Sequence, residues 1–316
     1  MDYIVFDLEW NQSPSGKKYA NSKIPFEIIE IGAVKLNEER KIVDSFQCLI
    51  KPQVYNWIHE NIHEVIHVNY RDLRHGKPFA QAVTAFMEWC GKDCAFFTWG
   101  DQDLTELQRN MKYYNLLSLL PGPVKYYDLQ KLASIYFNES PYRRALEYMV
   151  DKLEIKKSKG FHRALADAYY TAEILKRMDM EYVFQNYSVD VYQNPKTKKE
   201  ELFLSYPTYD KYISREFDSR EAVMKDREVT STRCPVCHLA AKRKLRWFIN
   251  NSKIYYSISS CAEHGYVEGK IRIRKTEEAK YYAIKYLKCV ELKEAEELRQ
   301  KRESIRQKRQ SKKSIT

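Results

Sequence analysis

No apolar run in this 316-residue sequence approaches the length of a membrane span. The first residues, MDYIVFDLEWN, lack the features of a signal peptide, because acidic side chains interrupt the apolar segment. Four of the seven cysteines (Cys48, Cys90, Cys94 and Cys289) stand singly in apolar surroundings, and the odd total argues against a disulfide framework. We therefore expect reduced thiols, a cytoplasmic location and no membrane partner.

Residues 1–179, more than half of the chain, also carry no net charge. Residues 180–232 carry −2, whereas residues 233–275 carry +8 and residues 276–316 carry +5. All of the excess positive charge is therefore C-terminal. This distribution is typical of a polyanion-binding appendage that follows a neutral domain.

Strand-like and helix-like segments alternate over the first 180 residues, and no internal repeat is visible. The strand-like segments are rich in β-formers, and Asp128 in VKYYDL is placed to cap a following helix. This alternation predicts an α/β fold, a mixed sheet flanked by helices. The segments expected as strands are DYIVFDLEW, FEIIEIGAVKL, KIVDSFQCLI, CAFFTWG and VKYYDL, and those expected as helices are Ile58–Val68, Phe79–Trp89, DLTELQRNMKYYN, PYRRALEYMVDKL and ALADAYYTAEIL.

We predict four parts along the chain. Residues 1–185 form the first domain, and the polar, tyrosine-rich residues 186–232 form a linker or irregular extension. Residues 233–275 form a small cysteine-bearing module. Residues 276–316 form a basic helix, whose apolar stripe contains Ala283, Leu287 and Val290.

Acidic residues recur where the predicted sheet would bind ligands. Asp7 and Glu9 alternate with apolar residues in FDLEWN, so both point from one face of a strand, about 7 Å apart. Two acids on one face of a central strand repel each other unless a cation lies between them. The alternative is an edge strand with a solvated polar face.

Two further acids lie at or near the starts of predicted helices. In TWGDQDLTEL, Asp103 stands where a strand gives way to a helix, although Asp101 is an alternative two residues earlier. In FHRALADAYYTAEIL, helical spacing puts Asp167 at the edge of the packing face, where a carboxylate needs a partner or a cation. His162 follows Gly160 on the entering loop, and the alternative for this pair is a surface histidine beside a solvated aspartate.

The set Asp7, Glu9, Asp103 and Asp167, with His162 five residues before the last, resembles the DEDDh family of 3′→5′ exonucleases. The resemblance covers about residues 1–180, includes IEIGAV and HRALADAYYTA, and in TWGDQDL is similar to the exoribonuclease branch. It implies a ribonuclease-H-like fold that releases 5′-mononucleotides from single-stranded 3′ ends, with RNA favoured over DNA. Trp10 stands where the family often has a small residue near the terminal nucleotide, so we expect Trp10 to contact nucleic acid.

The resemblance also implies two Mg²⁺ or Mn²⁺ ions, which suit the oxygen ligands of these acids and the charge of a phosphodiester. Asp7 would bridge the ions, Glu9 and Asp167 would bind one of them, and Asp103 would bind the other, largely through water. His162 would take a proton from the attacking water at neutral pH. The alternative is a non-catalytic nucleic-acid-binding or scaffold protein that has kept the fold.

The cysteine-bearing module carries the pattern C-x₂-C…C-x₂-H in Cys234, Cys237, Cys261 and His264. Two chelating pairs with 23 residues between them predict a four-coordinate structural zinc ribbon. His238 is an alternative to His264.

Cations interleaved with aromatic residues in this module suit single-stranded nucleic acid, whose phosphates and base faces are both accessible. The alternative is that the ribbon or the C-terminal helix docks on an acidic protein partner. The side chains predicted to bind nucleic acid there are Lys242, Arg243, Lys244, Arg246, Trp247, Arg272 and Arg274. His59, His63 and His67 also recur at helical spacing, but no acid or cysteine completes a metal set with them.

Overall fold

The computed structural model describes residues 1–55, 70–158, 160–250 and 254–313, which form two compact units, Met1–Gln193 and Asn194–Thr316. The segment 58–68, with His59, His63 and His67, lies outside the described residues. Among the helices that are described, none combines the length and the apolar character needed to cross a membrane.

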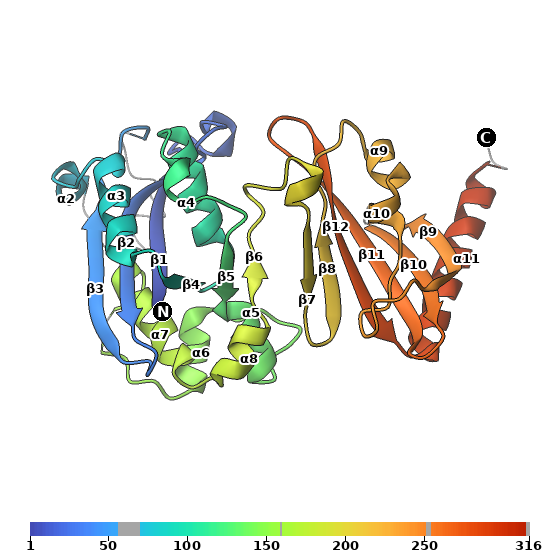
Figure 1. Ribbon diagram of the computed structural model, residues 1–316. Coiled ribbons are helices and arrows are strands. Elements are labelled where there is room, and N and C mark those ends of the chain that lie inside the picture. The colour runs from blue at the N-terminus through green and yellow to red at the C-terminus, as the bar shows by residue number, and fades with distance from the viewer. Residues whose placement is uncertain (56–69, 159, 251–253, 314–316) are drawn as a thin grey trace. The chain divides into compact units, whose positions relative to one another are not determined.

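The first unit contains a six-stranded mixed sheet of order β3-β2-β1-β4-β5-β6, with helices on both faces (Figure 1). This confirms the predicted fold class. Its elements are β1 (Asp2–Gln12), η1 (Lys17–Tyr19), β2 (Phe26–Leu36), β3 (Ile42–Leu49), α2 (Tyr70–Arg74), α3 (Phe79–Cys90), β4 (Cys94–Thr98), α4 (Gln102–Tyr113), η2 (Leu117–Leu119), β5 (Lys125–Asp128), α5 (Leu129–Tyr136), α6 (Leu146–Lys152), α7 (Ala164–Leu175), α8 (Met180–Gln185) and β6 (Ser188–Val189).

The central strand β1 separates two apolar cores because its side chains alternate between the faces of the sheet. Phe6 and its neighbours on one face pack against α3 and α4, whereas Tyr3 and Val5 on the other face belong to the core with α5, α6 and α7. Asp7 and Glu9 continue the row of Tyr3 and Val5, so both acids point toward the α7 side. As predicted, Asp128 caps α5 by accepting a hydrogen bond from the Lys131 N–H at 3.0 Å.

The start of α7 lies directly on the sheet because β2 has a glycine at the contact. Gly32 pairs with Asp7 across the sheet, and a Cβ on Gly32 would lie 2.0 Å from the Leu165 nitrogen and 2.2 Å from the Ala164 carbonyl carbon. No side chain fits in that space, so Gly32 is what allows the helix to bring its first turn close to Asp7.

We expect Gly32→Ala to destabilise the first unit by roughly 1–3 kcal/mol or more, because backbone atoms of α7 must move to admit the methyl group. Chemical denaturation of the full chain measures this loss. Gly160→Ala is the matched control, because a Cβ there meets nothing within 4 Å. Equal stability of the two variants would show that the contact between α7 and β2 is not tight.

The second unit contains a six-stranded antiparallel sheet of order β7-β8-β12-β11-β10-β9. On one face, Ile271 and Ile273 of β11 are buried against Val223 and Val229 of α9 and α10. The elements of this unit are η3 (Lys198–Glu200), β7 (Leu202–Ser205), β8 (Tyr209–Ile213), α9 (Arg220–Lys225), α10 (Arg227–Thr230), β9 (Lys242–Ile249), β10 (Ile254–Cys261), β11 (Gly265–Lys275), β12 (Tyr281–Val290) and α11 (Leu292–Lys313).

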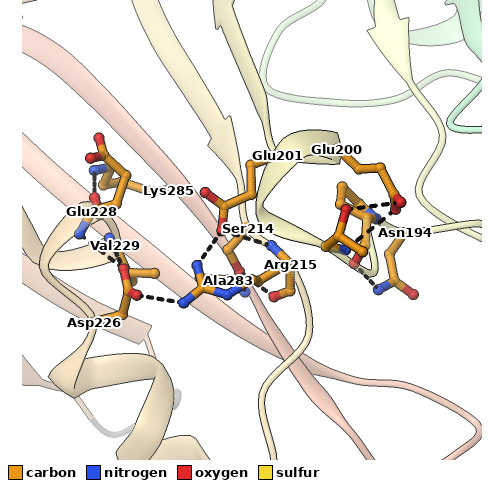
Figure 2. Close-up of polar contacts among 12 residues, drawn as sticks. Asn194, Glu200, Glu201, Ser214, Arg215, Asp226, Glu228, Val229, Ala283 and Lys285 are labelled. Carbon is orange, nitrogen blue, oxygen red and sulfur yellow. Dashed lines mark hydrogen bonds and ion pairs between the residues drawn. The ribbon is translucent and has the colours of Figure 1, made fainter.

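Polar contacts fasten α10 and the segment before β7 to this packed face (Figure 2). Arg215 forms ion pairs with Glu201 at 2.6 Å and with Asp226 at 2.9 Å, and Asp226 also caps α10. Lys285 of β12 is 3% exposed and donates to the carbonyl oxygen of Glu228 at 2.7 Å. Burial lowers the pKa of this lysine to about 8.

The structure corrects two predictions about the C-terminal half. Residues predicted as a linker contain β7, β8, α9 and α10, so the chain divides at Gln193 rather than near residue 185. The predicted helix over 276–316 is wrong for Tyr281–Val290, which is a strand inside the sheet, whereas the basic helix is present at Leu292–Lys313. The cysteine-bearing segment 233–275 is therefore part of a larger sheet unit.

Candidate active site

Three of the predicted acids come together where α7 begins over β1. Oxygen atoms of Asp7, Glu9 and Asp167 all lie within 4.8 Å of one another. The alternation of β1 supplies the first two carboxylates. Asp167 lies in the first turn of α7, where unpaired backbone N–H groups favour a negative charge.

Asp103 reaches the same strand from α4. Strand β4 pairs with β1 only through Asp2–Val5, so beyond Val5 this edge of β1 is no longer occupied by β4. The Leu8 N–H donates to Asp103 Oδ1 at 3.1 Å, and Asp103 is only 5% exposed. Asp101, the alternative considered from sequence, is exposed.

Burial and mutual repulsion make these carboxyl groups hard to ionise together. Burial, followed by the charges of Asp103 and Glu9, raises the pKa of Asp7 well above its usual range. Burial, followed by the charge of Asp167, raises the pKa of Glu9 to about 8. Burial also raises the pKa of Asp103 to about 7 and that of Asp167 to about 6.

The donor set suits divalent cations. Asp167 Oδ1 is buried and has no hydrogen-bond partner, which is costly for a carboxylate oxygen that ligates nothing. Hard cations such as Mg²⁺ and Mn²⁺ prefer carboxylate oxygens, and a cation among these acids removes the repulsion that raises their pKa values. Asp7, Glu9 and Asp167 thus have both the geometry and the chemistry of a cation site.

These pKa shifts predict a pH-dependent stability. Because the folded-state pKa values are raised, the folded protein binds more protons than the unfolded chain, and the free energy of unfolding falls as the pH rises from about 4, the pKa of an unperturbed carboxyl group, to about 8. We expect Mg²⁺ to reverse this loss, so the stabilisation by Mg²⁺ relative to EDTA should grow over the same range. Denaturation curves at pH 5.5, 7 and 8.5 measure it, and a stabilisation independent of pH would contradict the assignment.

His162 lies on the loop immediately before α7, as predicted. Its side chain is exposed, and its backbone adopts the left-handed region at φ 63°. The His162 N–H donates to Asp167 Oδ2 at 3.2 Å. The carboxylate therefore holds the backbone of this loop beside the start of α7.

An ion pair behind the carboxylates was not anticipated from sequence. Glu30 faces Glu9 across the β1–β2 pair and is fully buried. Arg163 donates two hydrogen bonds to Glu30, at 3.0 and 2.9 Å, and Gln47 donates a third at 2.7 Å. This bidentate pair holds the residue before α7 to the sheet. The only signal in the sequence was an acid at the centre of the mainly apolar segment FEIIEIGAVKL.

The second unit brings the predicted zinc ligands together. Cys234, Cys237, Cys261 and His264 offer ligand atoms within 4.8 Å of one another. Cys261 Sγ lies 3.6 Å from Cys237 Sγ and 3.6 Å from His264 Nδ1. His238 is exposed and lies 3.4 Å from Asp210, so it is not a member of this group.

The predicted nucleic-acid-binding residues fall into separate places. Arg272 and Arg274 are exposed on the face of β11 opposite Ile271 and Ile273. Trp10 is half-buried, with its ring 5.9 Å from that of Phe26, and its role toward nucleic acid stays a prediction. On the edge strand β9, Lys242 is exposed, and the cations Arg243, Lys244 and Arg246 line an open hollow of about 560 Å³.

Trp247 makes packing contacts that the sequence did not predict. Its indole packs against the core of the second unit, where a Cβ on Gly269 would approach the ring to 2.6 Å. Its N–H donates to the Thr230 carbonyl at 2.9 Å. Trp247 is half-buried, and its role toward nucleic acid stays a prediction.

The first unit of this chain matches the sequence model of a known protein family. Residues 4–175 match the sequence model of the RNase_T family, described as exonuclease. Because the match spans more than half of the chain, this protein belongs to that exonuclease family, whose members are hydrolytic nucleases. No curated protein sequence matches the chain.

Solved structures show similarity in fold. The nuclease domain of 3′hExo, a DEDDh family member bound to rAMP, is 18% identical with a TM-score of 0.51, and the alignment covers 59% of this chain and 96% of that domain. A full-length 3′-exonuclease is 20% identical with a TM-score of 0.48, covering 58% of this chain and 83% of the other. At these identities the likeness concerns the fold of the first unit.

Proposed function

We propose that the protein is a metal-dependent 3′→5′ exonuclease that hydrolyses single strands from their 3′ ends and releases 5′-mononucleotides, with RNA favoured over DNA. The observation that carries the proposal is the cluster of Asp7, Glu9 and Asp167 within 4.8 Å, with Asp103 hydrogen-bonded to the same strand. Membership of the exonuclease family supports it. The RNA preference rests on the similarity of TWGDQDL to the exoribonuclease branch.

The residues of this chain divide the work of the reaction. Asp7, Glu9 and Asp167 would hold the divalent cations with Asp103, and the bound cations would neutralise charge on the phosphate and on both reacting oxygens. His162, exposed beside Asp167, takes the proton of the attacking water. A scaffold protein has no need to keep repelling carboxylates together, which favours an enzyme.

Matched oligonucleotides test this function. RNA and DNA 20-mers of the same sequence, each labelled at the 5′ end and carrying a free or a 3′-phosphorylated end, are incubated with Mg²⁺. The proposal expects a ladder that shortens from the free 3′ end, with RNA degraded faster. Internal cuts, shortening from the 5′ end, or equal rates in EDTA would overturn it.

We also propose that Cys234, Cys237, Cys261 and His264 hold one structural zinc ion. Zinc–sulfur bonds of about 2.3 Å in a tetrahedron place sulfur atoms about 3.8 Å apart, close to the 3.6 Å between Cys237 and Cys261. Hydrogen bonds from the Glu263 and His264 N–H groups lower the pKa of Cys261 to about 6, which favours the thiolate that zinc binds.

Cys234→Ser should therefore lose the zinc and unfold the second unit, because binding free energy of the metal is folding free energy in such modules. Cys289→Ser is the matched control, since Cys289 packs beside Cys234 in the same small core but is not a member of the ligand group. Metal analysis and thermal unfolding measure both variants. One zinc per chain retained in Cys234→Ser would contradict the site.

A further inference from the structure

On one face, the sheet of the second unit packs against α9 and α10. On the other, which we call the open face, Arg272 and Arg274 are exposed, whereas Ile213 and Ile284 are buried. Along β11, Ile271 and Ile273 point into the core formed with α9 and α10. The residues between and beside them, Lys270, Arg272 and Arg274, point to the opposite face. There α11 packs over one end of the sheet, with Ala295 against residues of β9 and β10.

The open face carries positive charge. Register places Lys211 of β8 and Lys288 of β12 on the same face as Lys270, because Lys211 pairs with Tyr286, which pairs with Lys270, and Lys288 pairs with Glu268. Among the described strand residues of this face, Glu268 is the one acid. The cations on this face are Lys211, Lys242, Lys270, Arg272, Arg274 and Lys288, and Lys288 also forms an ion pair with Glu294 of α11 at 3.8 Å.

Tyrosine rings lie between these cations. Lys270 Nζ is 5.9 Å from the ring centroid of Tyr256, and Lys211 Nζ is 5.9 Å from that of Tyr286. The strand register places Arg272 on the same face, two residues along β11 from Lys270, which pairs with both Tyr256 and Tyr286. Both tyrosines are half-buried, and Lys301 of α11 also lies over the Tyr256 ring, with its Nζ 5.2 Å from the ring centroid.

We propose that this open face binds single-stranded nucleic acid. The cations match the phosphates of such a strand, and the rings match its unpaired bases, which a duplex would hide. An acidic protein would pair with the cations, but its carboxylates would not stack on the tyrosine rings. The inference rests on the proposed function only where it identifies the bound strand as the substrate.

The test measures binding separately from hydrolysis. The probe is a 5′-labelled 20-nucleotide oligouridylate with a 3′-phosphate, titrated in EDTA across salt concentrations with the full chain. Arg272→Ala/Arg274→Ala should weaken binding roughly tenfold at 0.1 M salt and reduce the slope of log K against log salt by about 1.4. Lys198→Ala/Lys199→Ala, which removes two exposed cations from η3, should behave as the parent does.

The tyrosines test the stacking part of the inference. Tyr256→Leu should weaken binding of the same probe several-fold, whereas Tyr256→Phe, which keeps the ring, should not. Circular dichroism of the full chain, loaded with zinc, checks that each variant is folded.

Hydrolysis of the dinucleotide UpU with Mg²⁺ separates this inference from the proposed function. UpU is too short to extend across the sheet face, so the Arg272→Ala/Arg274→Ala chain should cleave it at the parental rate. A parent that binds the 20-mer through Arg272 and Arg274 but never cleaves UpU or the 20-mer would overturn the exonuclease and leave the binding face intact. Unchanged affinity and salt slope in this variant would overturn the binding face. A variant that loses affinity for a polyglutamate peptide but keeps its affinity for the 20-mer would overturn it as well.

Discussion

Asp7→Asn is expected to abolish nucleotide release and, at the same time, to stabilise the metal-free protein. The cations that we propose these acids hold would stabilise the transition state by several kcal/mol, so hydrolysis should fall by roughly a thousandfold or more. The free energy of unfolding of the metal-free protein should rise, because the variant removes a buried carboxyl group whose negative charge Asp103, Glu9 and Asp167 all oppose. Activity assays with Mg²⁺ and denaturation in EDTA at pH 8 measure the two effects.

The opposite signs separate a loss of chemistry from a loss of fold. Asp101→Asn is the matched control, because Asp101 is exposed at the start of α4 and lies outside the carboxylate group. Asp101→Asn should leave the rate of hydrolysis and the free energy of unfolding near the parental values. An Asp7→Asn protein that keeps substantial activity, or that is destabilised in EDTA, would contradict the cation site.

His162→Asn is expected to slow single-turnover hydrolysis by roughly 10²–10⁴, the range for a lost general base. Asparagine tolerates the left-handed backbone at φ 63° and keeps the N–H that bonds to Asp167, so the loop should stay in place. Affinity for the 3′-phosphorylated 20-mer should therefore change little. The rate of the chemical step is measured with enzyme in excess over substrate.

His75→Asn serves as the control, since His75 is exposed in the first unit and does not contact the carboxylates. A rate within a few-fold of the parent for His162→Asn would show that His162 takes no part in proton transfer. A rate that recovers in His162→Asn as the pH is raised would instead identify hydroxide as able to replace the imidazole, in keeping with a general base.

The first unit and its acids could be predicted because local patterns determine them. Alternation along β1 places Asp7 and Glu9 on one face, and helical spacing places Asp167 at the start of α7. The pairing of Glu30 with Arg163 could not be predicted, because the two residues are 133 positions apart and only the packing of α7 on β2 brings them together.

The strand β12 was taken for a helix because its apolar spacing fits both structures. Ala283 and Leu287 are four residues apart, which places them on one face of a helix and equally on one face of a strand. Lys285 between them would be expected in solvent, yet the structure buries it against two backbone carbonyl groups, of Glu228 and Ser231. The packing of Trp247 against the core could not be predicted either, because a tryptophan among cations does not reveal whether its ring faces solvent or a core.

The most direct test of the central claim is hydrolysis in water enriched in ¹⁸O. A single strand with a free 3′ end is digested with the full chain and Mg²⁺, and the mononucleotides are analysed by mass spectrometry. The account predicts nucleoside 5′-monophosphates that each carry one ¹⁸O atom in the phosphate, with none formed by Asp7→Asn. Products with a 3′-phosphate, products without ¹⁸O, or an equal yield from Asp7→Asn would contradict it.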